Sequence, residues 1–562
     1  MRNQQRIQYL IVIAIIIAIN VLGTFVYKKW DLTEDKRFTL TNPTISLLQD
    51  VDQTIFVTVL LAGDLPAGFK RLKRSTQEML DEFANQNRLI HYQFSDPQKG
   101  NAQEVNAVAK ELAKDGIIPT RLRIRDKGEA REKLIYPFAV FNMGSESFTV
   151  NLLENERQGV NNELILNNSI GLLEYKFADA IQKLRQYGKP NIVFTAGHDE
   201  LSFEQTRYIE RRLRKNYNTA PIDLDSIISI PKDIDLVIIA KPRTAFSDKE
   251  LFVLDQYLVN GGNAIFLIDQ LNVSLDSLSR NRSYIPTAYD LNLAPLFFRY
   301  GARVQPNLIL DLECTRIPLV VGQLGGRVQT ELYPWFYHPL MASFSHHPIV
   351  KNIDRVNLSF PSTIDTVRTK AQIEKTILLT SSKYTRVQRI PVRLNFESVG
   401  IEPDPALFNK APQVVAVLLE GRQFSLFENR VTEEIQEQMR SLGNEFKVQN
   451  ASSKIMIVSD GDLAKNVYNA TSGDIKEIGF NKYENFVFQG NQALLFNAIE
   501  YMLDQEGIIE ARAKEVKLRM LDVVRAQQET LKWQLINVAL PLLLLLISVW
   551  GFNALRKRRY AH

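Results

Sequence analysis

One histidine and several carboxylates follow apolar runs of the sequence, where they could bind a polar ligand. Gly197-His198-Asp199-Glu200 comes directly after the apolar run NIVFTA. A histidine beside two carboxylates can donate and accept hydrogen bonds and can transfer a proton. The alternative interpretation is structural, with Gly197 making a turn and Asp199 and Glu200 placing negative charge at the first turn of the next helix. Because no nucleophile or second histidine is tied to this segment by spacing, the structural interpretation is favoured.

Three aspartates occupy comparable positions after other apolar runs. Asp269 follows NAIFLI, and Asp460 and Asp462 belong to SDGDL, which follows KIMIV. If these runs are parallel strands, the aspartates lie at the same edge of the sheet as His198, and together they could line one polar crevice that binds a ligand. Oxygen ligands of this kind can hold a divalent cation, but acidic residues beside glycine are typical of turns. We therefore predict ligand contacts here, without a metal or cofactor.

The signatures of common enzymes are absent from the sequence. Gly188-Lys189 is followed by proline and lacks the upstream glycine of a nucleotide-binding loop. There is no GxSxG, HExxH or CxxC pattern, and the single cysteine, Cys314, cannot form a thiolate metal site. We expect no catalytic residues.

The charge of the chain argues against nucleic acid as a partner. The formal net charge is +5 over 562 residues, and the basic residues are spread along the chain. A nucleic-acid-binding protein would gather them into a patch or stripe.

Two long uncharged runs are expected to cross a membrane. Tyr9–Tyr27 and Leu535–Leu555 are each long enough to span the hydrocarbon core as a helix, and Arg556 to Arg559 follow the second run with four basic residues. Basic flanks favour the cytoplasmic side, so both ends are expected inside the cell and the bulk of the chain in the periplasm of a bacterial inner membrane.

Between these runs, strands alternate with helices. A strand–helix–strand unit opens the first part, with the helix at Phe69–Gln86. In the second part, the apolar runs are separated by helices long enough to return over a sheet, which predicts a doubly wound parallel sheet. The predicted segments are a cytoplasmic N-terminus (1–8), a transmembrane helix (9–27), a first α/β domain (28–160), a connecting helix (161–187), a second α/β domain (188–504) with an insertion at about 275–370, a charged helix (505–534), a transmembrane helix (535–555) and a basic cytoplasmic tail (556–562).

The stretch after the first apolar run mixes charged and apolar residues. Arg37, Phe38 and Leu40 lie in DLTEDKRFTLT. This stretch is expected either to lie on lipid headgroups or to dock a partner subunit in the membrane, and docking is slightly favoured.

Several segments occur in the order found in a known family. They are DLTEDKRFTLT, GHDEL, DKELFVLDQYLVNGGNAIFLID, EGRQFSLFENR, SDGDL and GNQALLFNAIEYMLDQEGIIEARAKE, followed by the apolar run with its basic tail. In this order they resemble, over nearly the whole chain, the gliding-motility ABC transporter auxiliary proteins of the GldG family. The resemblance implies a second domain that is Rossmann-like and binds a ligand, such as a saccharide, without catalysis. It also implies a separate permease subunit and a separate ATPase subunit as partners.

The expected function is that of a non-catalytic, substrate-binding-like auxiliary subunit of an ABC transporter, required for gliding motility. Two alternatives stay open. The strand-end carboxylates could belong to a glycan-processing enzyme of the cell envelope, which would need two carboxylates facing each other across a pocket. The external domains could also form a scaffold that binds only other proteins.

Overall fold

The computed structural model describes residues 39–126, 129–154, 162–186, 188–281, 283–324, 327–396, 399, 403–441, 445–469, 471–513 and 529–560. The chain forms two compact units, residues 1–514 and 515–562. The first unit contains the strand-end residues, and the second contains the C-terminal helix.

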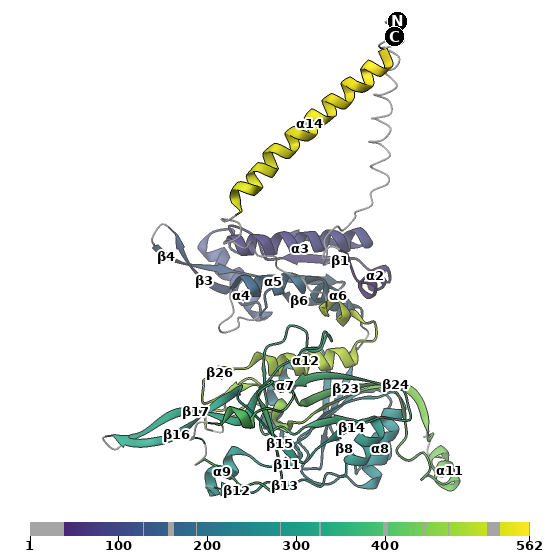
Figure 1. The fold of residues 1–562 in the computed structure, drawn as a ribbon. Coiled ribbons are helices and arrows are strands. Elements are labelled where there is room, and N and C mark those ends of the chain that lie inside the picture. The colour runs from purple at the N-terminus through teal and green to yellow at the C-terminus, as the bar shows by residue number, and fades with distance from the viewer. Residues whose placement is uncertain are drawn as a thin grey trace. The chain divides into compact units, whose positions relative to one another are not determined.

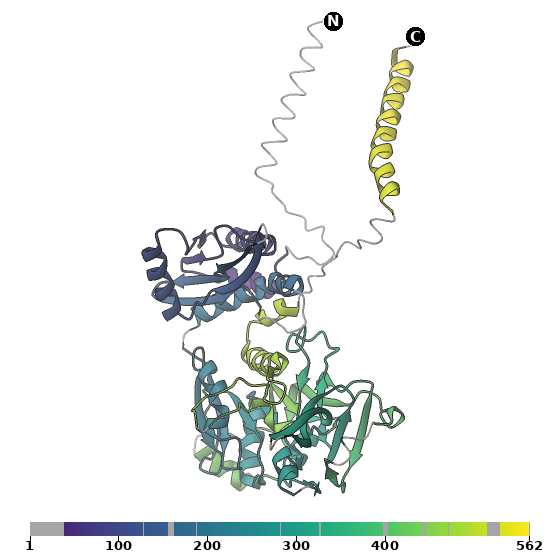
Figure 2. The same cartoon turned by 90° about the vertical axis from the view of Figure 1, so that its left-hand side faces the viewer.

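The N-terminal part of the first unit is built on a four-stranded sheet of order β2-β1-β5-β6 (Figures 1 and 2). β1 (Ile55–Val59) and β2 (Ile90–Phe94) are parallel, and α3 (Ala67–Gln86) connects them, so the predicted strand–helix–strand opening is present. β5 (Phe138–Met143) is antiparallel to β1 and to β6 (Glu146–Asn151). The other elements of this part are α2 (Asn42–Gln49), α4 (Ala102–Lys114), β3 (Thr120–Asp126), β4 (Glu129–Ile135), α5 (Asn162–Gly171) and α6 (Leu173–Arg185).

A packed aromatic core holds this part together. α3 buries residues at helical spacing, ending with Phe83, whose ring meets Phe177 of α6 edge to face at 5.9 Å. Phe177 also packs on Phe141 of β5, with ring centroids 5.3 Å apart. The two helices therefore cover the same face of the sheet.

A seven-stranded sheet of order β20-β23-β24-β10-β9-β7-β8 forms the centre of the larger part. Its strands are β7 (Asn191–Ala196), β8 (Asn218–Asp223), β9 (Ile234–Ala240), β10 (Asn263–Leu267), β20 (Ile373–Thr380), β23 (Val414–Phe424) and β24 (Gln449–Val458). Strand residues alternate between two cores, as Val237 and Ile238 do. α7 (Phe203–Leu213) and α12 (Gln489–Leu503) pack on one face, and α8 (Asp248–Val259) and α10 (Ala294–Tyr300) pack on the other.

The predicted fold class, two α/β domains with a Rossmann-like, doubly wound parallel sheet between two transmembrane helices, is wrong. β23 is antiparallel to β24, and β20 is antiparallel to β23, so the large sheet is mixed. Seven further sheets of two or three strands occur within the described residues. An apolar run shows that a strand is buried but does not show its direction. The parallel prediction assumed that a helix crosses back over the sheet before each strand. The helix between β23 and β24 is α11 (Glu433–Ser441), and most of its described side chains are exposed.

The insertion predicted at about 275–370 forms small sheets around a core that contains the buried Trp335. A long two-stranded ribbon, β16 (Cys314–Leu324) with β17 (Arg327–Met341), projects from it (Figure 1). The remaining short elements are β11 (Leu271–Asn272), α9 (Leu275–Asn281), β12 (Ser283–Tyr284), β13 (Thr287–Ala288), β14 (Ala302–Val304), β15 (Asn307–Asp311), β18 (Val356–Asn357), β19 (Ile364–Thr366), β21 (Thr385–Arg389), β22 (Leu394–Asn395), η2 (Pro405–Leu407), η3 (Gly461–Ala464), β25 (Phe480–Asn481) and β26 (Phe486–Val487).

After α12 the chain returns to the N-terminal part. The short helix η4 (Ile508–Ala513) places Ile508 and Ile509 in the N-terminal core. η4 lies within the predicted charged helix (505–534), of which residues 514–528 lie outside the described residues, so that helix stays a prediction.

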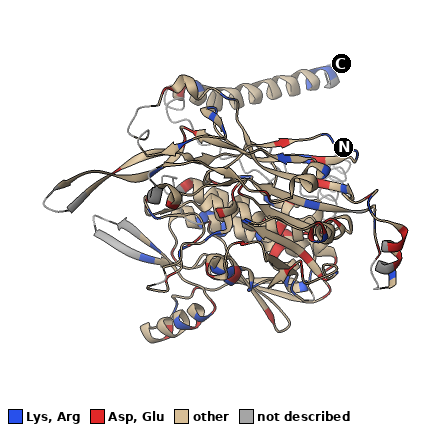
Figure 3. Ribbon diagram, turned by 90° about the horizontal axis from the view of Figure 1, so that it is seen from below, with Lys and Arg blue, Asp and Glu red and all other residues tan. Residues whose placement is uncertain are grey.

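The second unit contains α14 (Thr530–Tyr560), which ends in the basic residues seen in Figure 3. Its segment Lys532–Arg558 is the one helix among the described residues that is long and apolar enough to cross a membrane. The prediction of two terminal membrane helices is thus not met by the described chain, and the predicted crossing at residues 9–27 lies outside it.

Candidate functional site

The candidate site lies at the carboxyl ends of β7 and β9. β7 has β8 on one side and β9 on the other, and the loops that follow β7 and β9 lead to helices on opposite faces of the sheet. In open α/β sheets, the crevice at such a position is where ligands usually bind. The loop after β7 contains His198, and Lys241 follows β9 directly.

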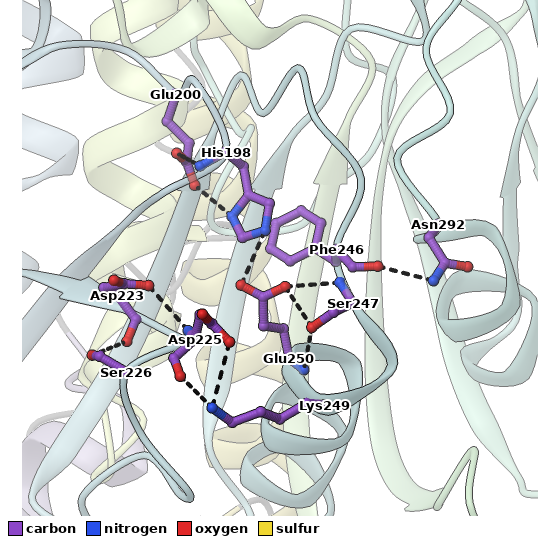
Figure 4. A network of polar contacts seen from close by, with 10 residues as sticks. All are labelled: His198, Glu200, Asp223, Asp225, Ser226, Phe246, Ser247, Lys249, Glu250 and Asn292. Carbon is purple, nitrogen blue, oxygen red and sulfur yellow. Dashed lines mark hydrogen bonds and ion pairs between the residues drawn. The ribbon is translucent and has the colours of Figure 1, made fainter.

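His198 is buried between two glutamates (Figure 4). Its Nε2 lies 3.1 Å from Oε1 of Glu250, and its Nδ1 lies 3.5 Å from Oε1 of Glu200. The imidazole also stacks on the ring of Phe246, with centroids 3.7 Å apart. Burial alone would lower the pKa of His198, but the contacts with Glu200 and Glu250 outweigh it and raise the pKa above its usual value.

Both glutamates are fixed by the local backbone. Oε2 of Glu200 accepts the backbone N–H of His198 at 2.6 Å, and the partners lower the pKa of Glu200 although burial opposes this. Glu250 is the third residue of α8, and its Oε2 accepts the backbone N–H and the hydroxyl of Ser247 in a capping box. The backbone N–H of Arg243 in the β9–α8 loop donates to the carbonyl of His198 at 2.7 Å. His198 thus joins the loops after β7 and β9.

This arrangement predicts a pH-dependent stability. The pKa of His198 is raised in the folded state. The stability that its ion pairs add is therefore fully present below the ordinary pKa of about 6.5, and it is lost as the pH rises through the folded-state pKa. The contribution of Glu200, whose pKa is lowered, is present above its ordinary value and is lost only in stronger acid. We expect His198→Gln to destabilise the protein by roughly 1–3 kcal/mol near pH 6, and by less at pH 9. Urea unfolding at several pH values measures this, with the exposed His91→Gln as control; a difference that grows with pH would contradict it.

The second group of charges surrounds Lys241. Its buried Nζ lies 2.9 Å from Oδ2 of Asp269 and 2.5 Å from Oδ2 of Asp462. The backbone N–H of Gly461 donates to Asp269 at 2.6 Å, and the carboxylate of Asp460 accepts the backbone N–H of Asp462 at 2.7 Å. A Cβ at Gly461 would lie 2.6 Å from Cγ of Lys241, so only glycine leaves room for the lysine.

Lys241 divides the three aspartates into two kinds. Burial and the negative charges of Asp269 and Asp462 raise the pKa of Asp460 well above its usual value. Burial would also raise the pKa of Asp462, but Lys241 and Lys465 lower it to about 2. Within one cluster, the pKa of Asp460 is thus shifted upward and that of Asp462 downward. Lys241 already occupies the place that a cation would take between these carboxylates.

Comparison with known proteins places the larger part of the chain in a protein family. Residues 189–498 match the model of the ABC transporter auxiliary family, described as an ABC-type uncharacterized transport system, over more than half of the 562 residues. The chain belongs to this ABC transporter auxiliary family. Membership makes it an accessory, transport-associated protein that works with components of a transport system. Together with Lys532–Arg558, membership indicates association with a membrane.

Other similarities are more distant. Residues 34–142 match a domain of unknown function (DUF7088). An uncharacterized protein of Borreliella burgdorferi (strain ATCC 35210 / DSM 4680 / CIP 102532 / B31) is 22% identical over 548 residues, which cover 95% of this chain and 94% of that protein. A solved structure, the mmIFT52 N-terminal domain, is 14% identical and covers 56% of this chain and 96% of that chain, with a TM-score of 0.30. That score is too low to support an argument.

The structure brings most of the predicted site residues together in this auxiliary-family protein, but in two clusters. Asp269 and Asp462 contact Lys241, and Asp460 joins this cluster through the backbone N–H of Asp462, whereas His198 and Glu200 form the other cluster. Asp199 is exposed, and its φ of 53° lies in the left-handed region, as is typical of a turn residue. The predicted ligand contacts stay a prediction.

Two central residues were missed by sequence reasoning. Glu250 could have been found, because Ser247 and Glu250 form the S-x-x-E pattern of a capping box in the sequence. Lys241 follows the apolar run DLVIIA directly, so the same argument that placed Asp269 at this edge also applies to it. The positive charge of this buried lysine offsets the repulsion between the neighbouring carboxylates.

The predicted docking residues are mostly outside the described chain. Arg37 and Phe38 lie there, whereas Leu40 is buried in the N-terminal core. Docking by this stretch stays a prediction.

The geometry bears on the catalytic alternatives for this family member. Membership in an auxiliary family is consistent with a protein that is not an enzyme. A glycosidase needs two carboxylates facing each other across a substrate pocket, but here Asp269 and Asp462 both contact one lysine. Among the described residues, no group of three or more His, Cys, Asp and Glu side chains has the arrangement of a metal site. A cavity of about 1090 Å³ lies at the opposite edge of the sheet, where Ile234 and Asn263 begin β9 and β10.

Proposed function

We propose that the chain is a membrane-anchored, non-catalytic auxiliary subunit of an ABC transporter that has a separate permease and a separate ATPase. The observation that carries this proposal is the match of residues 189–498 to the auxiliary family. The sequence supports a separate ATPase, because it lacks a nucleotide-binding loop of its own. The two charged clusters support a binding or coupling role over catalysis, because their charged groups already pair with one another.

The proposed location is a bacterial inner membrane, with the bulk of the chain before α14 on the periplasmic side. α14 supplies the anchor, and Arg556, Lys557, Arg558 and Arg559 favour the cytoplasm at its end. Export of the preceding residues needs an apolar N-terminal signal, and residues 9–27 contain one in the sequence.

Protease accessibility tests this location. Trypsin added to intact spheroplasts is expected to digest the first unit and to leave a small fragment that carries a C-terminal epitope tag. A cytoplasmic protein in the same cells serves as the control and has to stay intact. Protection of the first unit until the membrane is permeabilised would contradict the proposal.

We further propose that the transporter serves gliding motility where the host glides. The support is the ordered resemblance of segments such as GHDEL and SDGDL to the GldG family. Deletion of the gene is expected to abolish spreading on agar, and a plasmid copy to restore it. Normal spreading of the deletion strain would refute the motility role and leave the transporter role untouched.

A further inference from the structure

A cleft of about 350 Å³ lies inside the first unit, away from both charged clusters. One wall comes from β6 and α6 of the N-terminal part, and the other comes from α7 and α12, with η4 contributing Arg512. Small-molecule sites commonly occupy clefts of this size between the parts of a protein. The charges on the walls indicate what such a molecule would carry.

Three of the carboxylates that line the cleft lie near a lysine. Asp179 lies 2.7 Å from the Nζ of Lys183, and Glu500 accepts the hydroxyl of Tyr175 at 2.5 Å and lies 4.0 Å from the same Nζ. Glu154 lies 2.8 Å from the Nζ of Lys176. Asp179 and Glu500 share Lys183, and Asp354 also lines the cleft, so attraction for an anion has to come from basic groups that no carboxylate contacts.

Two arginines on the walls have no carboxylate partner within the described chain. Arg212 of α7 donates to Oε1 of Gln492 at 3.0 Å, a neutral acceptor, and its guanidinium lies 4.4 Å from the ring centroid of Phe496. The guanidinium of Arg512 lies 5.4 Å from the ring centroid of Tyr175, and its buried Nε has no hydrogen-bond partner in the part of the chain that is described. Both guanidinium groups thus lie near aromatic rings, and neither forms an ion pair within the described residues.

We propose that this cleft binds a small organic anion through Arg212 and Arg512, by a carboxylate or a phosphate group. A planar guanidinium pairs with either group through two parallel hydrogen bonds, which fixes the orientation of the anion as well as attracting it. Binding would also supply the acceptor that Nε of Arg512 lacks. The site goes beyond the proposed function, since it does not depend on a permease or an ATPase.

Titration calorimetry on the full-length chain in detergent micelles tests this site, with succinate and inorganic phosphate as separate probes at low salt. At least one probe is expected to bind at a single site, and Arg212→Gln and Arg512→Gln are each expected to weaken binding by roughly tenfold or more. The probe that binds identifies the group recognised.

Arg211→Gln is the matched control, because Arg211 neighbours Arg212 on α7 and does not line the cleft. Circular dichroism checks the fold of each variant, and Arg212, being exposed, keeps the test valid if Arg512→Gln fails to fold. Absence of binding by both probes at millimolar concentration would overturn the proposal. Equal binding by wild type and both glutamine variants would also overturn it.

Discussion

Replacement of Lys241 by methionine is expected to destabilise the first unit by about 3–5 kcal/mol. Methionine matches the length of the stem but removes the ammonium that contacts Asp269 and Asp462. Asp460 already has a strongly raised pKa, so the cluster has little capacity for further negative charge. Without Lys241, the carboxylates would have to take up protons or admit water.

Urea unfolding, followed by the fluorescence of the buried Trp335, measures this change. Because protons can neutralise the orphaned carboxylates, the penalty is expected to shrink as the pH is lowered from 8 to 5. Lys465→Met is the control, since Lys465 is partly exposed and contacts Asp462 at 3.3 Å; we expect it to cost at most about 1 kcal/mol. Equal, small effects of the two substitutions would contradict the assignment of Lys241 as the centre of the cluster.

Replacement of Lys183 by methionine is expected to weaken the contact between α6 of the N-terminal part and α12 of the larger part. We expect it to lower the free energy of unfolding by about 3 kcal/mol. Lys183 of α6 pairs with Asp179 and lies near Glu500 of α12, so it links the two parts. The cost falls at the low end of the range for a buried pair, because burial already raises the pKa of Asp179 and this carboxyl can take up a proton.

Hydrogen exchange locates this effect. Amides of α6 and α12 are expected to exchange faster in Lys183→Met, while those of β9 and β10 keep their wild-type rates. Arg74→Met removes an exposed pair with Glu78 on α3 and is expected to change little. Unchanged exchange in α12 of the Lys183 variant would show that the lysine does not stabilise the contact between α6 and α12.

The sequence contained enough information to place the acidic cluster, but not the direction of every strand. Asp269 and Asp460 could be placed at one edge because their strands β10 and β24 are neighbours and parallel. β23 could not be oriented, since VVAVLLEG would be equally apolar in a parallel or an antiparallel strand. The direction of a strand depends on the connection that precedes it, and the described side chains of α11 in that connection are mostly exposed.

Interactions between residues far apart in the sequence were harder to predict than the position of a residue at the edge of the sheet. Lys241 and Asp462 are separated by more than two hundred residues, and only the pairing of the strands between them brings them together. Tyr175 of α6 and Glu500 of α12 are also far apart in the sequence, and packing between the two helices' parts of the first unit brings them together. By contrast, the partner of Ser247 lies within the same helical turn, so the spacing in the sequence alone could have shown it.

Affinity capture of the full-length chain tests most directly whether it is an auxiliary subunit of an ABC transporter. The chain, tagged at its C-terminus and expressed from its own locus, is solubilised in mild detergent and captured. Mass spectrometry is expected to find one multi-span permease and one nucleotide-binding ATPase in amounts comparable to the chain. Capture of the chain without either component, under conditions that preserve another ABC transporter of the same membrane, would contradict the account.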